Sequence, residues 1–512
     1  MVRVAECDVM LLKTGETCWR AEQADRAALL IDMAEYFLAA KAAMLKARRT
    51  IYLLNWAFDP ATPLDPQPGG TGPEDDHIGP FLKKLVRERP DLDVRILCWK
   101  SALPVSATQH FFPHRAKQCF KGTPVRFRLD ATVPNGACHH QKMMIIDDQV
   151  AFCGGGDIAP DRWDTPDHPD DDPRRETSKY RKQCFVSRHE VMGIVDGEAA
   201  RALGEHFRER WRRATGERPQ EAQPPQGDVW PDRVKPQFTK ITAGVSRTNP
   251  GWKGFPEVRE NEALHLAAII AAKRCIYLEN QYFTSPAVAE ALARRLAEPD
   301  GPEVVLVSTQ HSPSYFDQMT MDRTRSMFLK HLNEADAYGR LHAYTPLTAK
   351  HRLIIVHAKL SIIDDTLLRI GSANLNNRST GFDTECDLSL EAQPEDQRAR
   401  AMIASLRTQL IGHWLNCAPE QVAEAAKVAG GVGAGIELLR AAGHGRLAPL
   451  RPKRIGPLAA VIAALHLGDP VAPGDSWRPW KRMKLIREQI DRIPAAPPLE
   501  MERPTPIPRS AA

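Results

Sequence analysis

The chain has 512 residues, of which 43% are hydrophobic, and this is enough for two ordinary domains with substantial cores. Lys and Arg number 69 against 64 acidic residues, and a net charge of +5 suits an anionic surface but is too weak to indicate a nucleic-acid-binding protein. The ten cysteines form no C-x-x-C pair, which favours reduced thiols over a disulfide framework or a zinc site.

The start of the chain shows no targeting segment. The first twenty residues, MVRVAECDVMLLKTGETCWR, lack the apolar core and the cleavage site of a signal peptide. No apolar run approaches the ~20 residues that a membrane-spanning helix needs. The sequence therefore predicts a cytoplasmic protein, or one peripheral at a membrane, and leaves export without a leader open.

Two segments of the chain repeat the same order of elements. Residues 21–49 are rich in Ala and Leu with helical spacing, and they lead into a predicted strand at 51–58. Residues 261–274 form a second predicted helix, which leads into a predicted strand at 276–283. Repetition of a complete unit indicates an internal duplication. A helix and a strand follow in each segment, predicted at 81–88 and 94–99 in the first and at 287–297 and 304–308 in the second.

A short motif, H-x-K-x4-D, occurs once in each repeat. Apolar runs interrupted by an Asp-Asp pair predict that each copy lies on two strands joined by a tight turn. Side chains alternate along a strand, so the histidine and the lysine of each copy share a face. The aspartate lies seven residues beyond its histidine, an odd offset that favours a structural or orienting role within the catalytic motif. The two copies comprise His140, Lys142 and Asp147, and then His357, Lys359 and Asp364.

Residues that follow each motif also match between the repeats. GGGD, with Gly155 and Asp157, corresponds to GSAN, with Ser372 and Asn374. Small residues let backbone N–H groups approach an anion, and an asparagine side chain can donate a hydrogen bond. Farther along, Glu190 and Glu385 lie at comparable distances from their motifs. Each glutamate either holds a histidine ring by a hydrogen bond or is a surface carboxylate.

The predicted fold is α/β, because strands alternate with helices. We expect two similar α-β-α sandwich halves with mixed sheets, related by a pseudo-twofold axis that brings the two motifs face to face. Residues 215–236 contain five prolines among polar residues, which is typical of a linker. The predicted organisation is a first half at 1–214, a Pro-rich linker at 215–255, a second half at 256–420, and a C-terminal extension at 421–512 with a disordered end from Pro497.

The paired motif resembles the signature of the phospholipase D superfamily, and the likeness extends over about residues 30–415. Four further blocks resemble the catalytic cores of eukaryotic-type phospholipases D. They are IYLLNW at 51–56, ILCWK at 96–100, DRWDT at 161–165 with His168, and IYLENQYF at 276–283.

This resemblance implies hydrolysis of the headgroup-side phosphodiester of a glycerophospholipid, such as phosphatidylcholine, at a membrane surface. His140 would attack phosphorus and form a phosphohistidine, while His357 would act as general acid and then as base. Water or an alcohol would accept the phosphatidyl group. Lys142 and Lys359 would hold the nonbridging oxygens, so no metal or other cofactor is expected.

The resemblance also suggests roles for nearby residues. Ser372 and Asn374, with the matching Gly155, would line the phosphate site. Asp157 would repel a phosphate and is expected to orient a lysine or a histidine instead. Trp163 lies in an Asp- and Pro-rich loop, where it either packs near the headgroup or anchors a solvated loop.

Other functions remain open at this point. A superfamily nuclease or phosphodiesterase would need a basic groove with stacking aromatic side chains. The weak net charge does not favour this function, so no nucleic-acid partner is expected. Cardiolipin synthase-like phosphatidyltransferases share the motif but usually carry membrane segments near the N-terminus. A non-catalytic lipid-binding scaffold would not need both histidines. The C-terminal SWRPWKRMKLIREQI, at 476–490, suits either a lipid interface or a helix docked on the core.

Overall fold

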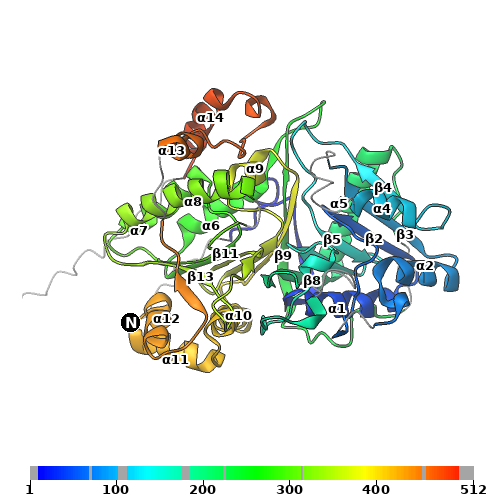
Figure 1. Cartoon of the computed structure of the whole chain (residues 1–512), viewed down its shortest axis with the longest axis horizontal. Coiled ribbons are helices and arrows are strands. Elements are labelled where there is room, and N and C mark those ends of the chain that lie inside the picture. Colours follow the sequence, from blue (N-terminus) through cyan, green and yellow to red (C-terminus); the bar gives the residue numbers. More distant parts are fainter. Residues whose placement is uncertain are drawn as a thin grey trace, which may run out of the picture.

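A single mixed β-sheet runs through the molecule and carries both repeats (Figure 1). The computed structural model describes residues 10–68, 72–101, 112–175, 184–222, 227–312, 315–452 and 457–494. In these ranges sixteen strands join the sheet, and a separate parallel pair is formed by β7 and β14. The predicted α/β class with mixed sheets is confirmed. The two predicted sheets, however, are one continuous sheet.

The strand order shows the internal symmetry. From the centre outward the order is β1-β8-β6-β5-β2-β3-β4 on one side and β9-β17-β16-β15-β11-β12-β13 on the other. β1 and β9 pair antiparallel, with Ala24 opposite Ile241, so the halves meet in a shared ladder rather than at a loose interface. Matching positions in the two orders are matching elements of the two repeats, as a pseudo-twofold axis requires.

The first half contains eight strands and four α-helices among its described residues. They are β1 (Arg20–Ile31), α1 (Met33–Lys46), β2 (Thr50–Asn55), α2 (Ile78–Glu88), β3 (Asp93–Trp99), α4 (Phe112–Cys119), β4 (Arg126–Asp130), β5 (Met143–Ile146), β6 (Val150–Gly154), β7 (Arg188–His189), β8 (Val191–Asp196) and α5 (Gly197–Thr215).

The second half repeats this order with small additions. Its elements are β9 (Phe238–Asn249), β10 (Val258–Arg259), α6 (Glu260–Ala271), β11 (Cys275–Asn280), α7 (Pro286–Ala297), β12 (Glu303–Val307), α8 (Tyr315–Ala335), β13 (Leu341–Pro346), β14 (Ile355–Val356), β15 (Lys359–Ile363), β16 (Leu367–Gly371), α9 (Asn377–Gly381), β17 (Glu385–Glu391) and α10 (Gln397–Leu415).

The long helix predicted at 21–49 is wrong in its first part. Residues 20–31 form β1, and only Met33–Lys46 is helical. The stretch is rich in Ala and Leu, which favour helices, but β1 lies between β8 and β9 at the centre of the sheet. Pairing on both edges and burial of both faces outweigh a local preference of a few tenths of a kcal/mol per residue.

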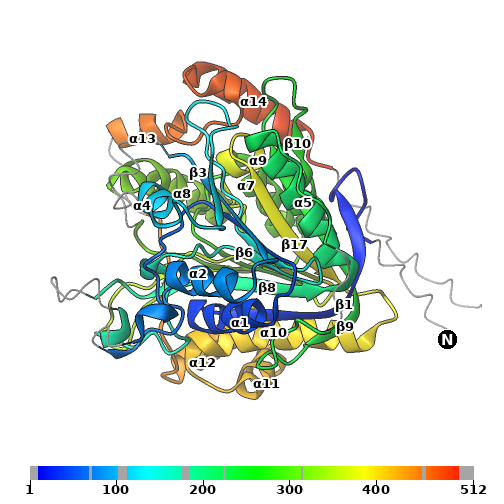
Figure 2. The same ribbon diagram turned by 90° about the vertical axis from the view of Figure 1, so that its right-hand side faces the viewer.

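The predicted linker at 215–255 contains the other central strand. Residues 238–249 form β9, which pairs with β1, β17 and the short β10. Pro219, Pro231 and Pro236 precede β9 and Pro250 follows it, so the predicted linker contains this central strand, which lies beside β1 (Figure 2). Polar residues such as Thr239 and Lys240 made β9 hard to predict from the sequence, although most of the strand is buried.

The core lies on both faces of the sheet. In β2, Tyr52 and Leu54 face one hydrophobic cluster, while Ile51 and Leu53 face another, as strand alternation requires. The first of these clusters takes buried side chains from both halves, including Trp211 of α5 and Trp414 of α10. Packing therefore joins the halves as well as the β1–β9 ladder.

The C-terminal extension covers two places on the second half (Figure 1). β18 pairs with β13 at the edge of the sheet, α11 and α12 pack near α10, and α13 and α14 lie against α8 and α7. The predicted disordered end falls outside the described residues. The extension consists of α11 (Pro419–Ala429), α12 (Val432–Ala441), β18 (Leu447–Pro449), α13 (Pro457–Ala464) and α14 (Pro479–Asp491).

Among the described residues, no helix combines the length and the hydropathy of a membrane span. The nine cysteines that the structure describes are free thiols, in agreement with the absence of a disulfide framework.

Candidate active site

The two motif hairpins, β5–β6 and β15–β16, hold the lysines in the same way. Lys142 Nζ donates to the carbonyl oxygen of His140 at 2.6 Å, and Lys359 Nζ donates to that of His357 at 2.7 Å. Both lysine side chains are fully buried. Asp157 Oδ2 lies 3.7 Å from Lys142 Nζ, and Gln281 Oε1 lies 3.4 Å from Lys359 Nζ. Each ammonium group is therefore fixed beside its own histidine.

The motif aspartates bind backbone rather than the lysines or histidines. Asp147 accepts hydrogen bonds from the N–H groups of residues 48, 49 and 50 at 2.8, 2.7 and 2.6 Å. Asp364 accepts from those of residues 273, 274 and 275, each at 2.8 Å. Each carboxylate thus ties the motif hairpin to the turn that precedes the neighbouring strand, β2 or β11. This geometry agrees with the structural role suggested by the odd offset.

Backbone hydrogen bonds between the halves bring the motifs together. His357 N donates to His189 O at 2.8 Å, next to the parallel β7–β14 pair. The symmetric contact is made by His140 N, which donates to Thr384 O at 3.0 Å. The residue after each acceptor is a glutamate. Each glutamate therefore lies beside the histidine of the opposite half.

His140 forms the better defined of the two histidine–glutamate pairs. Its Nδ1 lies 2.9 Å from Glu385 Oε2. Two hydroxyl groups also donate to this carboxylate, Ser372 Oγ to Oε2 at 2.5 Å and Ser379 Oγ to Oε1 at 2.7 Å. A fully buried carboxylate with three donors is a rigid partner, and it fixes the orientation of the imidazole.

His357 has a different environment. Its Nδ1 lies 3.2 Å from Glu190 Oε1, a close approach that is not aligned as a hydrogen bond. Arg162 and Arg188 approach the same carboxylate oxygen at 3.7 and 3.9 Å. The neighbours of Glu190 are therefore arginines, whereas the neighbours of Glu385 are serines. The pseudo-twofold symmetry holds for the backbone but not for the charges near the two histidines.

Burial governs the ionisation of both pairs. It lowers the pKa of His140 and of His357 well below the usual value, with further lowering by the neighbouring lysines. Burial also raises the pKa of Glu385 to about 8 and that of Glu190 to about 7. The same desolvation lowers the pKa of Lys359 well below its usual value. An anion between the lysines would supply the counter-charge that the buried cations favour.

The Gly-led turns lie where the halves touch. A Cβ atom on Gly155 would stand 3.1 Å from His357 O and 3.4 Å from Lys359 Cδ, so glycine allows the second motif to approach. Asp157 Oδ1 accepts from the N–H groups of Trp56 and Ala57 at 2.9 and 3.0 Å. Its other oxygen faces Lys142, which agrees with the predicted orienting role.

Ser372 and Asn374 differ in their availability to a ligand. The Ser372 hydroxyl is engaged with Glu385, so it positions that carboxylate and is not free for the direct phosphate contact that the sequence suggested. Asn374 is 5% exposed, and its side-chain oxygen has no hydrogen-bond partner among the described residues. Asn374 therefore keeps a polar side chain that a ligand could engage.

Trp163 anchors its loop in the core. It is 5% exposed, belongs to the hydrophobic cluster of the first half, and packs under the Arg174 guanidinium at 4.8 Å. Of its two predicted roles, loop anchoring fits this burial and headgroup packing does not.

Several residues near the motifs were not predicted as part of the site. Ser379 and Arg188 lie beside the glutamates, and no pattern in one sequence marks them. Arg162, Gln281 and Trp56 lie within blocks that carried the family resemblance, and Trp56 packs edge-on against the His140 ring at 6.3 Å. Those blocks were the available signal for these three residues.

Family models match both halves of the chain. One described as "Phospholipase D" matches residues 43–225, and one described as "Cardiolipin synthase, PLD-like domain" matches residues 266–407. Together with the duplicated fold and the paired motif, these matches show that the chain belongs to the phospholipase D superfamily.

Curated relatives are similar at low identity. "Phospholipase D A" of Dictyostelium discoideum is 23% identical over 433 residues, covering 72% of this chain and 33% of the relative. "Phospholipase D1" of Saccharomyces cerevisiae is 24% identical over 437 residues, covering 68% and 26%. "Phospholipase D gamma 3" of Arabidopsis thaliana is 23% identical over 482 residues, covering 66% and 55%. The chain thus spans between about a quarter and about half the length of these relatives.

A solved structure shares the fold. The phosphatidylserine synthase of Haemophilus influenzae superposes with a TM-score of 0.52 at 14% sequence identity, and the match covers 76% of this chain and 87% of that chain. At this identity the likeness shows the architecture alone, two halves in one fold.

Replacing the motif aspartates tests their structural role. Asp147→Ala leaves three backbone N–H groups without their acceptor, and Asp364→Ala does the same in the second half. We expect each variant to lose about 2 kcal/mol or more of unfolding free energy, measured by urea denaturation. Asp167→Ala, at an exposed position of the same half, serves as the control. Unchanged stability in both motif variants would contradict this role.

Proposed function

We propose that the protein is a phospholipase D. It hydrolyses the headgroup-side phosphodiester of glycerophospholipids, such as phosphatidylcholine, to phosphatidic acid, and it can transfer the phosphatidyl group to alcohols. The observation that carries this proposal is the pair of histidine–glutamate contacts, each made across the halves to a buried glutamate and each next to a buried lysine. This arrangement suits one phosphodiester held between two imidazoles.

The lysines bind the phosphate in this proposal. Each ammonium group keeps one hydrogen bond to a backbone carbonyl, which leaves further N–H donors for the nonbridging oxygens. The two positive charges offset the negative charge that develops on those oxygens as the attacking nitrogen approaches. The side-chain amide N–H group of Asn374 is the additional donor in this proposal.

His140 is the nucleophile in the first step. Its Nδ1–H donates to Glu385, so the lone pair of Nε2 is free to attack phosphorus. The new P–N bond forms as the P–O bond to the headgroup breaks. His357 gives a proton to the departing alcohol, so the headgroup leaves as a neutral hydroxyl compound.

In the second step, His357 acts as a base and the bond between phosphorus and His140 breaks. His357, now neutral, takes a proton from water or from an alcohol, and the resulting oxygen nucleophile attacks phosphorus. The P–N bond breaks and returns its electron pair to His140. Water gives phosphatidic acid, and an alcohol gives a phosphatidyl-alcohol. The well-formed Glu385 contact supports His140 as the nucleophile, because a carboxylate at Nδ1 stabilises the positively charged phosphohistidine.

Three other functions share parts of this site. A cardiolipin synthase-like phosphatidyltransferase would use the same two steps with a lipid hydroxyl as acceptor, and the family model over the second half carries that description. A nuclease or other phosphodiesterase would place a different diester between the lysines. A non-catalytic scaffold would bind lipid without turnover. Products formed from lipid and DNA substrates distinguish these functions.

The decisive assay offers phosphatidylcholine together with a primary alcohol. Wild type should form phosphatidic acid and the phosphatidyl-alcohol, while His140→Ala and His357→Ala should each lower the rate by about 10³-fold or more. His114→Ala, at an exposed position of α4, should leave the rate unchanged. Mass spectrometry of protein denatured rapidly at neutral to alkaline pH, where a P–N bond survives, should find the phosphatidyl adduct on His140. An adduct on His357 would reverse the roles, and cleavage of DNA with no lipid turnover would favour the nuclease.

The hydroxyl donors to Glu385 set a testable pH dependence. Burial raises the pKa of Glu385 to about 8, whereas Ser372 and Ser379 lower it by donating to the carboxylate. The ionised carboxylate is the stronger acceptor for His140 Nδ1–H and the form that stabilises a positively charged ring, so activity falls as the pH falls through this pKa. Replacing both serines by alanine raises the pKa further. The acidic limb of the kcat/KM profile should therefore move to higher pH, with roughly tenfold lower activity at pH 6 for a shift of one unit. Ser476→Ala is the control, and an unmoved limb would contradict this role.

A surface on the C-terminal extension fits a membrane. Trp477 and Trp480 are 78% and 69% exposed, and Arg478, Lys481 and Lys484 are exposed beside them. The opposite face of α14 is docked on the core, because Arg482 is buried with its Nε 2.6 Å from Asp475 Oδ2. The docked face fits one of the two predicted alternatives for this helix, and we infer that the exposed face contacts lipid. Aromatic side chains with basic neighbours suit an anionic lipid interface.

Vesicle binding tests this surface. The double substitution Trp477→Ala and Trp480→Ala should weaken sedimentation with phosphatidylserine-containing vesicles by roughly tenfold or more, because two interfacial anchors are lost. Turnover of a short-chain lipid below its micellar concentration should stay unchanged, since the motifs are intact. Tyr338→Ala removes another exposed aromatic side chain and serves as the matched control. Equal binding by all three proteins would assign membrane contact to another surface without bearing on the reaction.

A further inference from the structure

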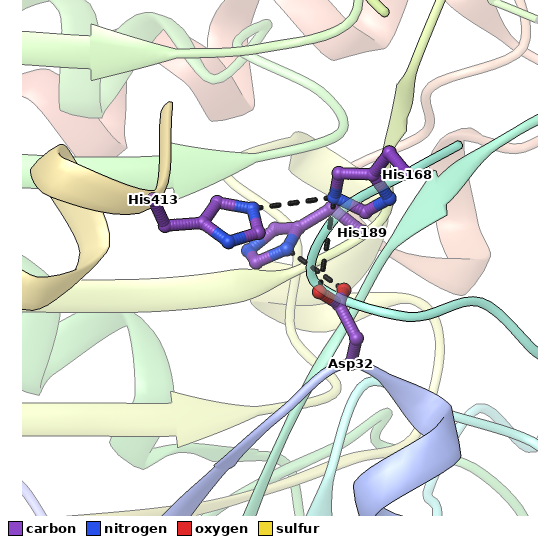
Figure 3. Close-up of side chains that lie close together, drawn as sticks. All are labelled: Asp32, His168, His189 and His413. Carbon is purple, nitrogen blue, oxygen red and sulfur yellow. Dashed lines mark hydrogen bonds and ion pairs between the residues drawn. The ribbon is translucent and has the colours of Figure 1, made fainter. Parts of the chain in front are cut away.

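A second cluster of histidines lies outside the motifs. Asp32, at the start of α1, His168, in the loop before β7, His189 of β7 and His413 of α10 point toward one another (Figure 3). One possible ligand atom from each residue lies within 4.8 Å of the others. Three of these side chains are buried and His413 is half-buried. The cluster joins the first half to the second through α10.

Carboxylates behind two of the rings fix their tautomers. His168 Nδ1 lies 2.9 Å from Asp164 Oδ2, which also accepts from Arg188 N. This acceptor requires a proton on Nδ1, so the lone pair of neutral His168 lies on Nε2. His189 Nε2 lies 2.8 Å from Glu279 Oε2, so its lone pair lies on Nδ1. A metal-binding histidine usually donates its other ring nitrogen to a carboxylate or a carbonyl in this way.

Both lone pairs point into the cluster. His168 Nε2 lies 3.2 Å from His413 Nε2, and His189 Nδ1 lies 2.9 Å from Asp32 Oδ1. Asp32 Oδ2 is buried without a hydrogen-bond partner among the described residues and lies 3.7 Å from His168 Nε2. If His189 is neutral, the lone pair of its Nδ1 faces a lone pair of Asp32 Oδ1, and the two atoms repel each other. A cation bound among the four groups removes this repulsion.

Three of the separations are near those around one metal ion. Two ligand atoms about 2.0–2.1 Å from a tetrahedral zinc ion are about 3.3 Å apart. The distances above are 2.9, 3.2 and 3.7 Å, and the four ligand atoms all lie within 4.8 Å of one another, so the side chains must close slightly on the ion. The ring centres of His168, His189 and His413 lie 5.1, 5.2 and 6.0 Å apart, which leaves room for a shared centre. Three imidazoles and one carboxylate are a donor set suited to Zn²⁺ and to similar divalent transition metals.

We propose that Asp32, His168, His189 and His413 form a binding site for one divalent transition-metal ion of the zinc class, which links α10 to the first half. Four protein ligands fill the coordination of tetrahedral zinc, so the role is structural. None of the four residues is assigned a role in the proposed phosphodiester reaction. The site is nevertheless connected to it, because the His189 carbonyl accepts from His357 N and the next residue is Glu190.

A proton on His189 Nδ1 is the alternative to the metal ion. If no metal binds, His189 must carry protons on both nitrogens to donate to Asp32 and to Glu279 at once. The two occupants give different results with added metal, because a doubly protonated ring has no lone pair to offer. The experiment therefore uses the metal itself as the probe.

The test uses the untagged full chain, stripped with a chelator and dialysed, then titrated with cobalt chloride or zinc chloride. We expect visible absorption bands of tetrahedral cobalt that saturate at one equivalent, one zinc per chain after gel filtration, and a higher unfolding temperature with zinc. His413→Gln and His168→Gln should each weaken zinc binding by roughly 100-fold or more, whereas His114→Gln should bind as wild type does.

Wild type that elutes from gel filtration without zinc and shows no tetrahedral cobalt bands would overturn the proposal and favour the protonated network. Zinc held with equal affinity by wild type and by both cluster variants would also overturn it, by placing the metal elsewhere. The wild-type measurements decide the question even if a variant fails to fold. Neither outcome depends on lipid turnover.

Discussion

Each motif histidine of this protein contacts a glutamate from the other half. These contacts begin in the backbone, where His140 N and His357 N donate to carbonyl groups across the pseudo-twofold axis. In both halves, the residue after the carbonyl group is a glutamate. The backbone hydrogen bond therefore places that glutamate beside the histidine. The central β1–β9 ladder and the shared hydrophobic cluster hold the halves at the spacing that these contacts need. Neither motif histidine has its glutamate partner in its own half.

Charge burial is the cost of this arrangement and the source of its chemistry. Two lysines, two histidines and two glutamates lie in a region with little water, where ionisation is expensive and shifts every pKa toward the neutral form. An anionic phosphodiester between the lysines, as in the proposed function, would reduce that penalty. The binding of such a substrate thus favours the charged form that stabilises the transition state.

Much of the site could be predicted because its signals are local. The H-x-K-x4-D spacing, the two predicted hairpins and the repeated helix–strand order all follow from short-range patterns, and Asp147 and Asp364 bind backbone as their odd offset suggested. The central strands could not be predicted in this way. β1 has the composition of a helix and β9 follows a Pro-rich stretch, so only their pairing in the sheet makes them strands.

Long-range contacts account for the other missed features. Glu190 and Glu385 were recognised as candidate partners of the histidines, but their exchange between halves follows from the shared sheet and has no sequence signature. Ser372 was expected to contact phosphate, and its engagement with Glu385 depends on β17 lying beside β16. The grouping of Asp32, His168, His189 and His413 likewise spans almost the whole chain, and no spacing rule would connect residues so far apart.

Because the histidines and glutamates are exchanged, two separate copies of one half could in principle assemble the same site. Joining both copies in one polypeptide makes that assembly intramolecular, so it no longer depends on protein concentration. Fusion has a second effect. In a symmetric dimer every substitution appears twice, whereas here serines surround one glutamate and arginines the other. Covalent linkage thus permits the two imidazoles to evolve separate tasks within a single pocket.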